Sequence, residues 1–475
     1  MRKYYLGSGL TQETFWAAGA TKRDIVIIVA TLAIGAAQMI GGHIWAPLVV
    51  IAIGGTLVGV SHVGSYVGVA LGDRAAAWIA AWLAQAAGVG RFDEGVPWFA
   101  EGVQVAGFQP PGAAGEMAVI LRDPDGLRVF KWRTVTLATT VIRLGGAFQG
   151  LDEWAVINNQ ARRFGELLKA AGNPRWGIRQ IDVVTRIRPA SLEAQQAWDD
   201  SRGAGAEAAE MRALVAAQAS QQETWLTVTC EPRLLGDGDW LDRVCAGAWE
   251  PTVEMVRQAA AAGLDPYRVI SPQRLAGTLR SLLTPDSPAD PDTSLDGPWA
   301  GIPRIRTTPI GVVTDTGWWH STAVVNADGW PADTVGPDFM DDLLGDIPGA
   351  PYRLVVSQLG MMPRRLAQNK ARVTGTVAGA AALAEETVSD LTTGENRQHF
   401  NSAQNMLGEL LEKGVGVMPV IRIMVSAKSR DDLLLARQAV RETLDTIGFT
   451  GDYWCDGIHG RMLGAFLMMG RGLKL

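Results

Sequence analysis

Cysteine and histidine are scarce in this sequence of 475 residues. The three cysteines, Cys230, Cys245 and Cys455, are too few and too scattered for a disulfide framework, which favours a reducing compartment. The five histidines are dispersed, and none pairs with another at the spacing of a zinc site. The one local group of ligand types, Asp452, Cys455, Asp456 and His459, is interpreted as a loop before the last helix, because a structural site needs about four Cys or His ligands. We therefore expect no bound metal.

The motifs of several enzyme classes are also missing. The sequence contains no Gly-x-x-x-x-Gly-Lys-Ser/Thr loop to hold nucleotide phosphates, which excludes a P-loop ATPase. It contains no Gly-x-Ser-x-Gly nucleophile elbow. Neighbouring acids such as Glu385 and Glu386 point in different directions on a helix and cannot act as an acid and base pair. We therefore expect no enzyme activity and no cofactor.

Charged residues are absent from a long stretch near the N-terminus. No Lys, Arg, Asp or Glu occurs between Asp24 and Asp73. A Gly-Gly-His sequence divides this stretch into two apolar blocks, 25–42 and 44–60, each close to the roughly 20 residues that cross a bilayer. A long bent core helix is the alternative, but a stretch of this length without charge is rare in a soluble protein. The sequence therefore predicts a two-helix transmembrane hairpin.

Basic residues flank the predicted hairpin on both sides, and the turn between its two spans has none. They are Arg2, Lys3, Lys22 and Arg23 before the hairpin and Arg74 and Arg91 after it. The positive-inside rule then places both termini in the cytoplasm. A cleaved signal peptide is disfavoured because the first apolar block starts only at Ile25 and leads directly into a second span. We expect a multi-pass protein of the cell (inner) membrane.

Small residues in and after the second span recur at a four-residue spacing, which lets another helix approach closely. They are Gly55 and Gly59, followed by Gly64, Gly68 and Gly72. The predicted contact is either between the two spans of the hairpin or with a partner's helix. The next segment carries Arg74, Trp78 and Trp82, which is typical of an amphipathic helix at the headgroup interface.

The rest of the chain alternates between strand and helix patterns, which predicts a large mixed α+β or α/β region in the cytoplasm. We divide the chain into a tail and hairpin (1–72), a juxtamembrane amphipathic helix (73–95), a first α/β part (96–283), a flexible Pro- and Asp-rich linker (284–300) and a second α/β part (301–475). Strands are predicted at 117–121, 129–137, 178–187, 224–230, 302–313, 321–325, 352–358 and 418–426. Helices are predicted at 152–168, 192–220, 240–262, 363–391, 400–412 and 429–447.

A repeated order of elements suggests that the two α/β parts are related halves. A helix, a strand with an internal Arg-Ile pair and a longer helix describe both residues 152–220 and residues 400–447. Helix, strand, helix is a common order, so recurrence by chance is the alternative.

The order of these features resembles a family of actinobacterial membrane proteins encoded on conjugative elements. The resemblance rests on the hairpin, on Arg74, Trp78 and Trp82, on Trp330-Pro331 and on the ending from Arg461 to Leu473. In that family the hairpin is similar to the small PrgI-type subunit, and the cytoplasmic part is similar to the N-terminal, non-motor region of type IV secretion ATPases. The ending departs from the expected Leu-Pro-Leu-Gly-Arg-Gly, since Met468-Met469-Gly470-Arg471-Gly472 stands there.

The resemblance implies a structural subunit of a DNA- or protein-translocating complex that works beside a separate ATPase and other membrane subunits, and a homo-oligomer is compatible with it. Four of the 43 basic and two of the 49 acidic residues precede Asp73, which leaves 39 against 47. This excess of acid argues against direct nucleic-acid binding. The alternatives are an EccE-like component of a type VII secretion complex and, from another class, a membrane-tethered glycosyltransferase-like enzyme. The last alternative lacks clustered acids, because Asp290-Pro-Asp292 lies in the linker.

Overall fold

The computed structural model describes residues 31, 99–100, 103–104, 118–122, 127–131, 136–145, 154–190, 201–202, 207, 210–211, 220–233, 240–270, 272–287, 305–325, 330, 339–362, 365, 367–369, 372, 416–449, 453–456, 459–468 and 470. The predicted hairpin and juxtamembrane helix lie outside these residues, apart from Thr31, which is helical. Within the described residues, no helix is both long enough and apolar enough to cross a membrane.

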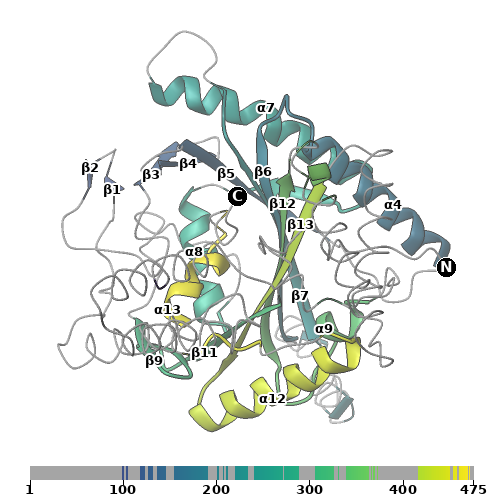
Figure 1. Cartoon of the computed structure of the whole chain (residues 1–475). Helices are drawn as coiled ribbons and strands as arrows, with labels where there is room; N and C mark the ends of the chain where they lie inside the picture. The colour runs from purple at the N-terminus through teal and green to yellow at the C-terminus, as the bar shows by residue number, and fades with distance from the viewer. Residues whose placement is uncertain are drawn as a thin grey trace, which may run out of the picture.

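An 11-stranded sheet forms the centre of the described structure (Figure 1). Its strands are β3 (Ala118–Arg122), β4 (Leu127–Lys131), β5 (Thr136–Leu144), β6 (Ile178–Pro189), β7 (Ser220–Cys230), β8 (Pro266–Val269), β9 (Ile305–Thr308), β10 (Gly311–Thr314), β11 (Trp319–Val325), β12 (Tyr352–Met362) and β13 (Gly416–Ala427). Their spatial order is β3-β4-β5-β7-β6-β12-β13-β11-β10-β9, and β8 also pairs with β5. A separate hairpin joins β1 (Phe99–Ala100) and β2 (Val103–Gln104). All of these pairings are antiparallel, so the described region is α+β.

Two units of the same topology meet in this sheet. In the first, the meander β3-β4-β5 is followed by α4 (Trp154–Ala171), β6, β7, α7 (Trp240–Ala261) and β8. Its order β8-β5-β7-β6 is that of a split βαβ, or ferredoxin-like, unit. The second unit repeats it with the meander β9-β10-β11, the short α9 (Asp341–Leu344), β12, β13 and α12 (Arg430–Ile447). A backbone bridge between Trp454 and Ala323 takes the place of β8.

The residue pairing follows the same plan in both units. The β5–β7 and β11–β13 ladders each contain seven pairs, starting from Ala138 opposite Cys230 and from Trp319 opposite Ala427. The units join through β6 and β12, which are also antiparallel. An approximate two-fold axis between β6 and β12 therefore relates the two units.

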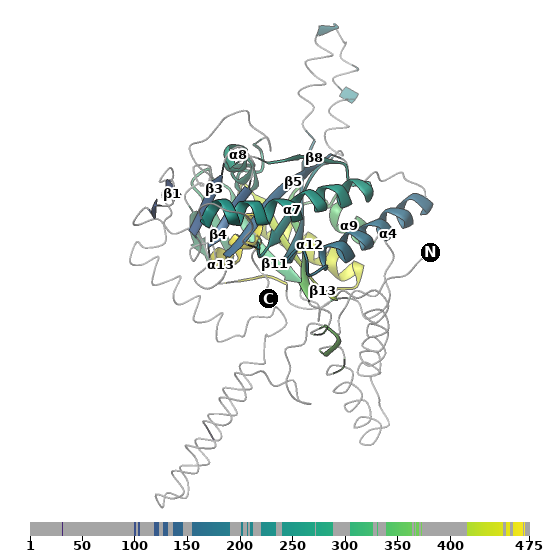
Figure 2. The ribbon, with the colours of Figure 1, turned by 90° about the horizontal axis from the view of Figure 1, so that it is seen from above.

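The helices cover both faces of the sheet. Ile181 in β6 packs in the core under α4 and α7, and Ile187 packs in the core under α9 and α12. These two residues are an even number of positions apart on one strand, so all four helices lie on the same face. In Figure 1, α9 and α12 lie beside the lower ends of the long strands, and α4 and α7 lie side by side in Figure 1 and Figure 2.

The opposite face of the sheet carries α8 (Pro272–Leu283) and the C-terminal segment, which consists of α13 (His459–Met462) and a 3-10 turn, η5 (Leu463–Phe466). Leu279 of α8 and Phe466 of η5 pack in one core with Val184 of β6 and Val356 of β12. The C-terminal segment therefore contributes to a core that both units share.

Most of the predicted elements that the structure describes are confirmed. Strands β6, β7, β11, β12 and β13 and helices α4, α7 and α12 lie at the predicted positions. Helix α12 begins after Ser429, whose hydroxyl accepts the Asp432 N–H, and it ends at Gly448, whose φ of 95° favours glycine. The predicted helices 192–220 and 363–391 are described only in part, and residues 201, 207, 210–211, 365, 367–369 and 372 within them are helical. The predicted helix 400–412 and most of the predicted linker lie outside the described residues.

Two predicted strands are wrong in their extent. The run 129–137 is divided between β4 and β5, and the run 302–313 is divided between β9 and β10. Only four residues separate β4 from β5 and only two separate β9 from β10, so each pair of strands resembles one continuous run in the sequence. At the second turn Gly311 lies so close to β11 that a Cβ there would be 2.4 Å from the His320 carbonyl oxygen.

The prediction also paired the wrong strands of the two halves. Aligning residues 152–220 with 400–447 matches β6 with β13, whereas the topology matches β6 with β12 and β7 with β13. Both β6 and β13 are long, buried strands with a buried arginine, Arg186 or Arg422. The local pattern therefore could not distinguish the second strand of one unit from the third strand of the other.

Candidate functional site

The residues predicted to act in the membrane lie outside the described part of the chain. They are the packing glycines Gly55, Gly59, Gly64, Gly68 and Gly72 and the interface residues Arg74, Trp78 and Trp82. Their roles stay predictions. The described residues instead contain several groups of buried polar side chains on and beside the sheet.

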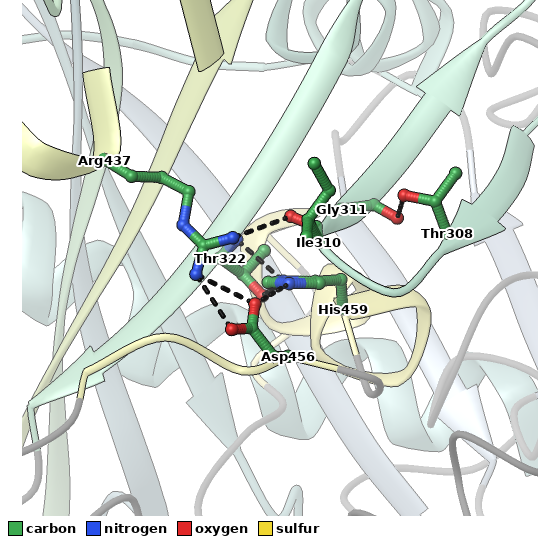
Figure 3. Close-up of polar contacts among 7 residues, drawn as sticks. All are labelled: Thr308, Ile310, Gly311, Thr322, Arg437, Asp456 and His459. Carbon is green, nitrogen blue, oxygen red and sulfur yellow. Dashed lines mark hydrogen bonds and ion pairs between the residues drawn. The ribbon is translucent and has the colours of Figure 1, made fainter. Parts of the chain in front are cut away.

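One group of polar side chains connects α12, β11 and α13 (Figure 3). His459, the first residue of α13, is fully buried, and its Nε2 lies 3.1 Å from Asp456 Oδ1. Its Nδ1 lies 3.0 Å from both the backbone nitrogen and the hydroxyl of Thr322 in β11. Arg437 of α12 donates to Asp456 over 2.9 Å and to the Ile310 carbonyl over 3.3 Å.

These contacts fix the protonation of the group. Because the Thr322 N–H donates to Nδ1 of His459, the proton of the neutral ring is on Nε2, which donates to Asp456. Burial raises the pKa of Asp456, but hydrogen bonds from His459 and Arg437 and the charge of Arg437 outweigh it and hold that pKa below its usual range. Asp456 is therefore ionised at neutral pH.

A hydroxyl, an imidazole and a carboxylate stand here in the order that nucleophilic enzymes use. Thr322 is fully buried within β11, however, so its hydroxyl cannot reach a substrate. The lone pair of His459 Nδ1 is also engaged by a backbone N–H, which leaves it poorly placed to accept the hydroxyl proton. The group instead acts as a clamp that holds α13 against β11. Arg437, which lies 4.7 Å from the Trp454 ring centroid, extends this clamp to α12.

The four residues weighed as metal ligands fall in this region. Cys455 is buried, and both ring nitrogens of His459 are engaged by protein atoms. Asp452 lies outside the described residues. Among the residues that the structure describes, no three His, Cys, Asp or Glu side chains are grouped so that they could hold a metal ion.

A second buried group lies where the two units meet. Asp182 in β6 stands opposite Gln358 in β12 and accepts a 2.6 Å hydrogen bond from Gln180. Gln358 accepts a hydrogen bond from Nε of Arg422 in β13. Burial raises the pKa of Asp182 to about 7, although the Gln180 hydrogen bond and the Arg422 charge oppose the rise. A carboxyl that titrates near neutral pH is thus buried beside the two-fold axis.

The two units also carry one buried polar pair each at equivalent positions, related by that axis. In the first unit Thr139 and Thr229 form a buried hydroxyl pair at 3.1 Å, and in the second unit His320 Nδ1 lies 2.8 Å from the Ser426 hydroxyl. Each pair is the second in its ladder. Burial lowers the pKa of His320 to about 4, and a hydrogen bond with the Leu283 backbone opposes this effect. Only the second unit therefore carries a titratable group at this position.

No family model matches this chain, and no curated protein matches it either. The polar groups must therefore be interpreted from their own geometry. Sequence reasoning missed Thr322 and Arg437, because their partners come from distant elements. It missed Asp182, because the burial of that residue depends on the pairing of β6 with β12. The one visible signal was the pair Asp456 and His459, which are three residues apart and so lie within one turn of chain.

Proposed function

We propose that this chain is a non-enzymatic structural subunit of a type IV secretion or conjugation-like translocation complex, which docks a separate ATPase at the inner membrane. The observation that carries the proposal is the stretch without charge between Asp24 and Asp73, whose two apolar blocks have the length of membrane spans. Basic residues on both sides of the stretch favour a body that shares the cytoplasm with the ATPase.

Two equivalent helices of the body have apolar side chains that could contact a partner. Helix α7 follows β7 and α12 follows β13, and both lie on the same face of the sheet. Trp249 and Val253 of α7 are 39% and 49% exposed, and Leu434 and Leu435 of α12 are 40% and 61% exposed. Paired exposed apolar residues are typical of docking surfaces. A face with two such helices suits an assembly built from repeated subunits.

The buried polar groups support a structural role. Thr322, His459 and Gln358 are each fully buried, and their hydrogen bonds connect β11 with α13 and β12 with β13. Buried hydrogen bonds of this kind stabilise one arrangement of the elements. They do not present a reactive atom to solvent.

The proposal is tested by crosslinking the full-length chain to the secretion ATPase of its own system in native membranes. We expect the double variant Leu434→Glu and Leu435→Glu to lose most of the crosslink and the transfer or secretion activity, because the charges oppose apolar contact. Gln438→Glu, which adds one charge at another exposed position of α12, is the control and keeps both. Equal crosslinking by both variants and wild type would rule out α12 as the docking surface.

The class of ATPase that crosslinks also separates the proposed complex from a type VII secretion complex. The purified chain should not hydrolyse ATP, because the sequence has no phosphate-binding loop. Turnover that survives removal of contaminating ATPases would refute the non-enzymatic role.

A further inference from the structure

Helices α9 and α12 of the second unit present an acidic face to solvent. Among their described residues, five exposed carboxylates stand against two exposed arginines. The carboxylates belong to Asp342, Asp431, Asp432, Glu442 and Asp445, and the arginines are Arg430 and Arg441. Asp341 is also exposed but has a further interaction, so its charge is not counted. This acidic face therefore carries a net negative charge.

Two of these carboxylates accept hydrogen bonds from neutral groups. Glu442 accepts from the Gln438 amide over 2.9 Å, and Asp445 accepts from the Tyr453 hydroxyl over 3.1 Å. A neutral donor orients a carboxylate but does not cancel its charge. The negative charge at this end of α12 therefore remains to attract a partner of opposite charge.

The equivalent helices of the first unit have the opposite balance of charge. Among their described residues, α4 and α7 expose four basic side chains and two acidic ones. The basic residues are Arg162, Arg163, Lys169 and Arg257, and the acidic ones are Glu166 and Glu250. Because α7 and α12 follow equivalent strands in the two units, the fold itself does not require an acidic surface. The acidic charge therefore distinguishes the second unit from the first.

Two exposed leucines lie within the acidic face. Leu434 is 40% exposed and Leu435 is 61% exposed. Residues three or four positions apart on a helix are neighbours, so Asp431 lies beside both leucines. Gln438 lies beside them in the other direction, and Glu442 is one turn further along. The surface is thus apolar at its centre and acidic at both ends, which is complementary to an amphipathic helix with basic residues beside its apolar stripe.

We propose that this acidic face binds a basic amphipathic helix of the secretion ATPase. The apolar side chains of that helix cover Leu434 and Leu435, and its Lys or Arg side chains pair with Asp431 and Glu442. The same carboxylates repel an anionic membrane surface, which disfavours a lipid partner. The inference rests on the proposed docking role and adds the chemistry of the partner's segment.

The test places a photo-crosslinking amino acid at Gln438 of the full-length chain, in native membranes that contain the ATPase. We expect the crosslinked peptide to come from an ATPase helix with Lys and Arg beside an apolar stripe, in a yield that falls as salt rises. Asp431→Asn with Glu442→Gln should lower the yield about fivefold, the effect of two exposed ion pairs. Glu166→Gln with Glu250→Gln is the matched control, because it removes the same charge from the first unit, and it should keep the full yield.

Several results would overturn the inference. They are a crosslink to an ATPase segment without basic residues, to a second copy of this chain or to lipid, and equal yields from the two double variants. A lysine-reactive crosslinker, which needs no residue on the acidic face, separates this failure from that of the proposed function. If it joins the ATPase to the chain while Gln438 reaches no basic helix, only the inference fails. If it joins no ATPase to the chain, both fail.

Discussion

At the scale of single residues, two buried ionisable groups make the stability of the body depend on pH in opposite directions. His320 has a pKa lowered to about 4, and Asp182 has a pKa raised to about 7. Below neutral pH the unfolded chain takes up a proton at His320 before the folded chain does. Between pH 4 and pH 7 the folded chain keeps a proton at Asp182 that the unfolded chain has lost. Variants at each site should separate the two effects.

His320 should weaken the fold in acid. Its pKa is lowered from 6.5 in the unfolded chain to about 4 in the folded chain. The stability that the neutral ring contributes is therefore fully present above pH 6.5 and is lost as the pH falls toward 4. A shift of this size corresponds to roughly 3 kcal/mol. In His320→Asn, the free energy of unfolding measured with urea should no longer fall by this amount between pH 7 and pH 4.5. Thr139→Val, which breaks the equivalent hydroxyl pair, should cost about 1 kcal/mol at both pH values. An unchanged acid loss in His320→Asn would contradict the assignment.

Asp182 should weaken the fold as the pH rises. Its folded pKa of about 7 lies above the unfolded value of 3.8, so stability contributed by the protonated form falls between pH 4 and pH 7. Asp182→Asn, which resembles the protonated acid, should match wild type near pH 4 and be more stable by roughly 2–4 kcal/mol at pH 8. Urea unfolding at each pH measures this difference in the free energy of unfolding. Asp431→Asn, at an exposed position of α12, is the control. A variant that is less stable than wild type at pH 8 would show that Asp182 is ionised and paired with Arg422.

At the scale of elements, the clamp around His459 should hold the C-terminal segment on the sheet. His459→Ala leaves the buried Thr322 N–H without its acceptor, which costs about 1–3 kcal/mol locally. Amide hydrogen exchange of residues 463–468 should become faster. Asp445→Asn, which weakens the Tyr453 hydroxyl contact of α12, should leave exchange there unchanged. Equal exchange in wild type and His459→Ala would show that apolar packing alone holds this segment.

A second prediction at this scale concerns the glycine stripe Gly64, Gly68 and Gly72. Replacing all three with Leu should keep the segment apolar and inserted as predicted, while the bulky side chains should hold a neighbouring helix away. Crosslinked complexes in membranes should therefore be reduced several-fold at equal amounts of inserted protein. If the complexes and the transfer activity match those of wild type, the stripe is not an assembly surface.

The elements themselves show what the sequence could predict and what it could not. Helix α12 could be predicted because the spacing of its apolar residues, the Ser429 cap and Gly448 all indicate the same helix. The division of residues 302–313 into β9 and β10 could not be predicted, because only Pro309 and Ile310 separate the two strands. Helix α8 and strand β8 were missed, and α8 carries the carbonyls that hold Arg186. The candidate sites depend on contacts between residues up to 137 positions apart, which no local pattern reports.

At the scale of the whole molecule, two split βαβ units share one antiparallel sheet and one core. Strands β6 and β12 join them, and the C-terminal segment packs against both. Equivalent positions have diverged, as in the hydroxyl pair Thr139 and Thr229 and the pair His320 and Ser426. The outer helices α7 and α12 expose apolar residues on one face. In the proposed complex this face docks the ATPase, and residues 1–72 are predicted to anchor the chain in the membrane.

The most direct test of this account measures where the secretion ATPase of the same system is found in fractionated cells. We predict that the ATPase sediments with the membranes when the full-length chain is present. It should become soluble when the chain is absent or when residues 1–72 are deleted, although the shortened chain still binds it. An ATPase that distributes equally between membrane and soluble fractions in all three strains would contradict the account.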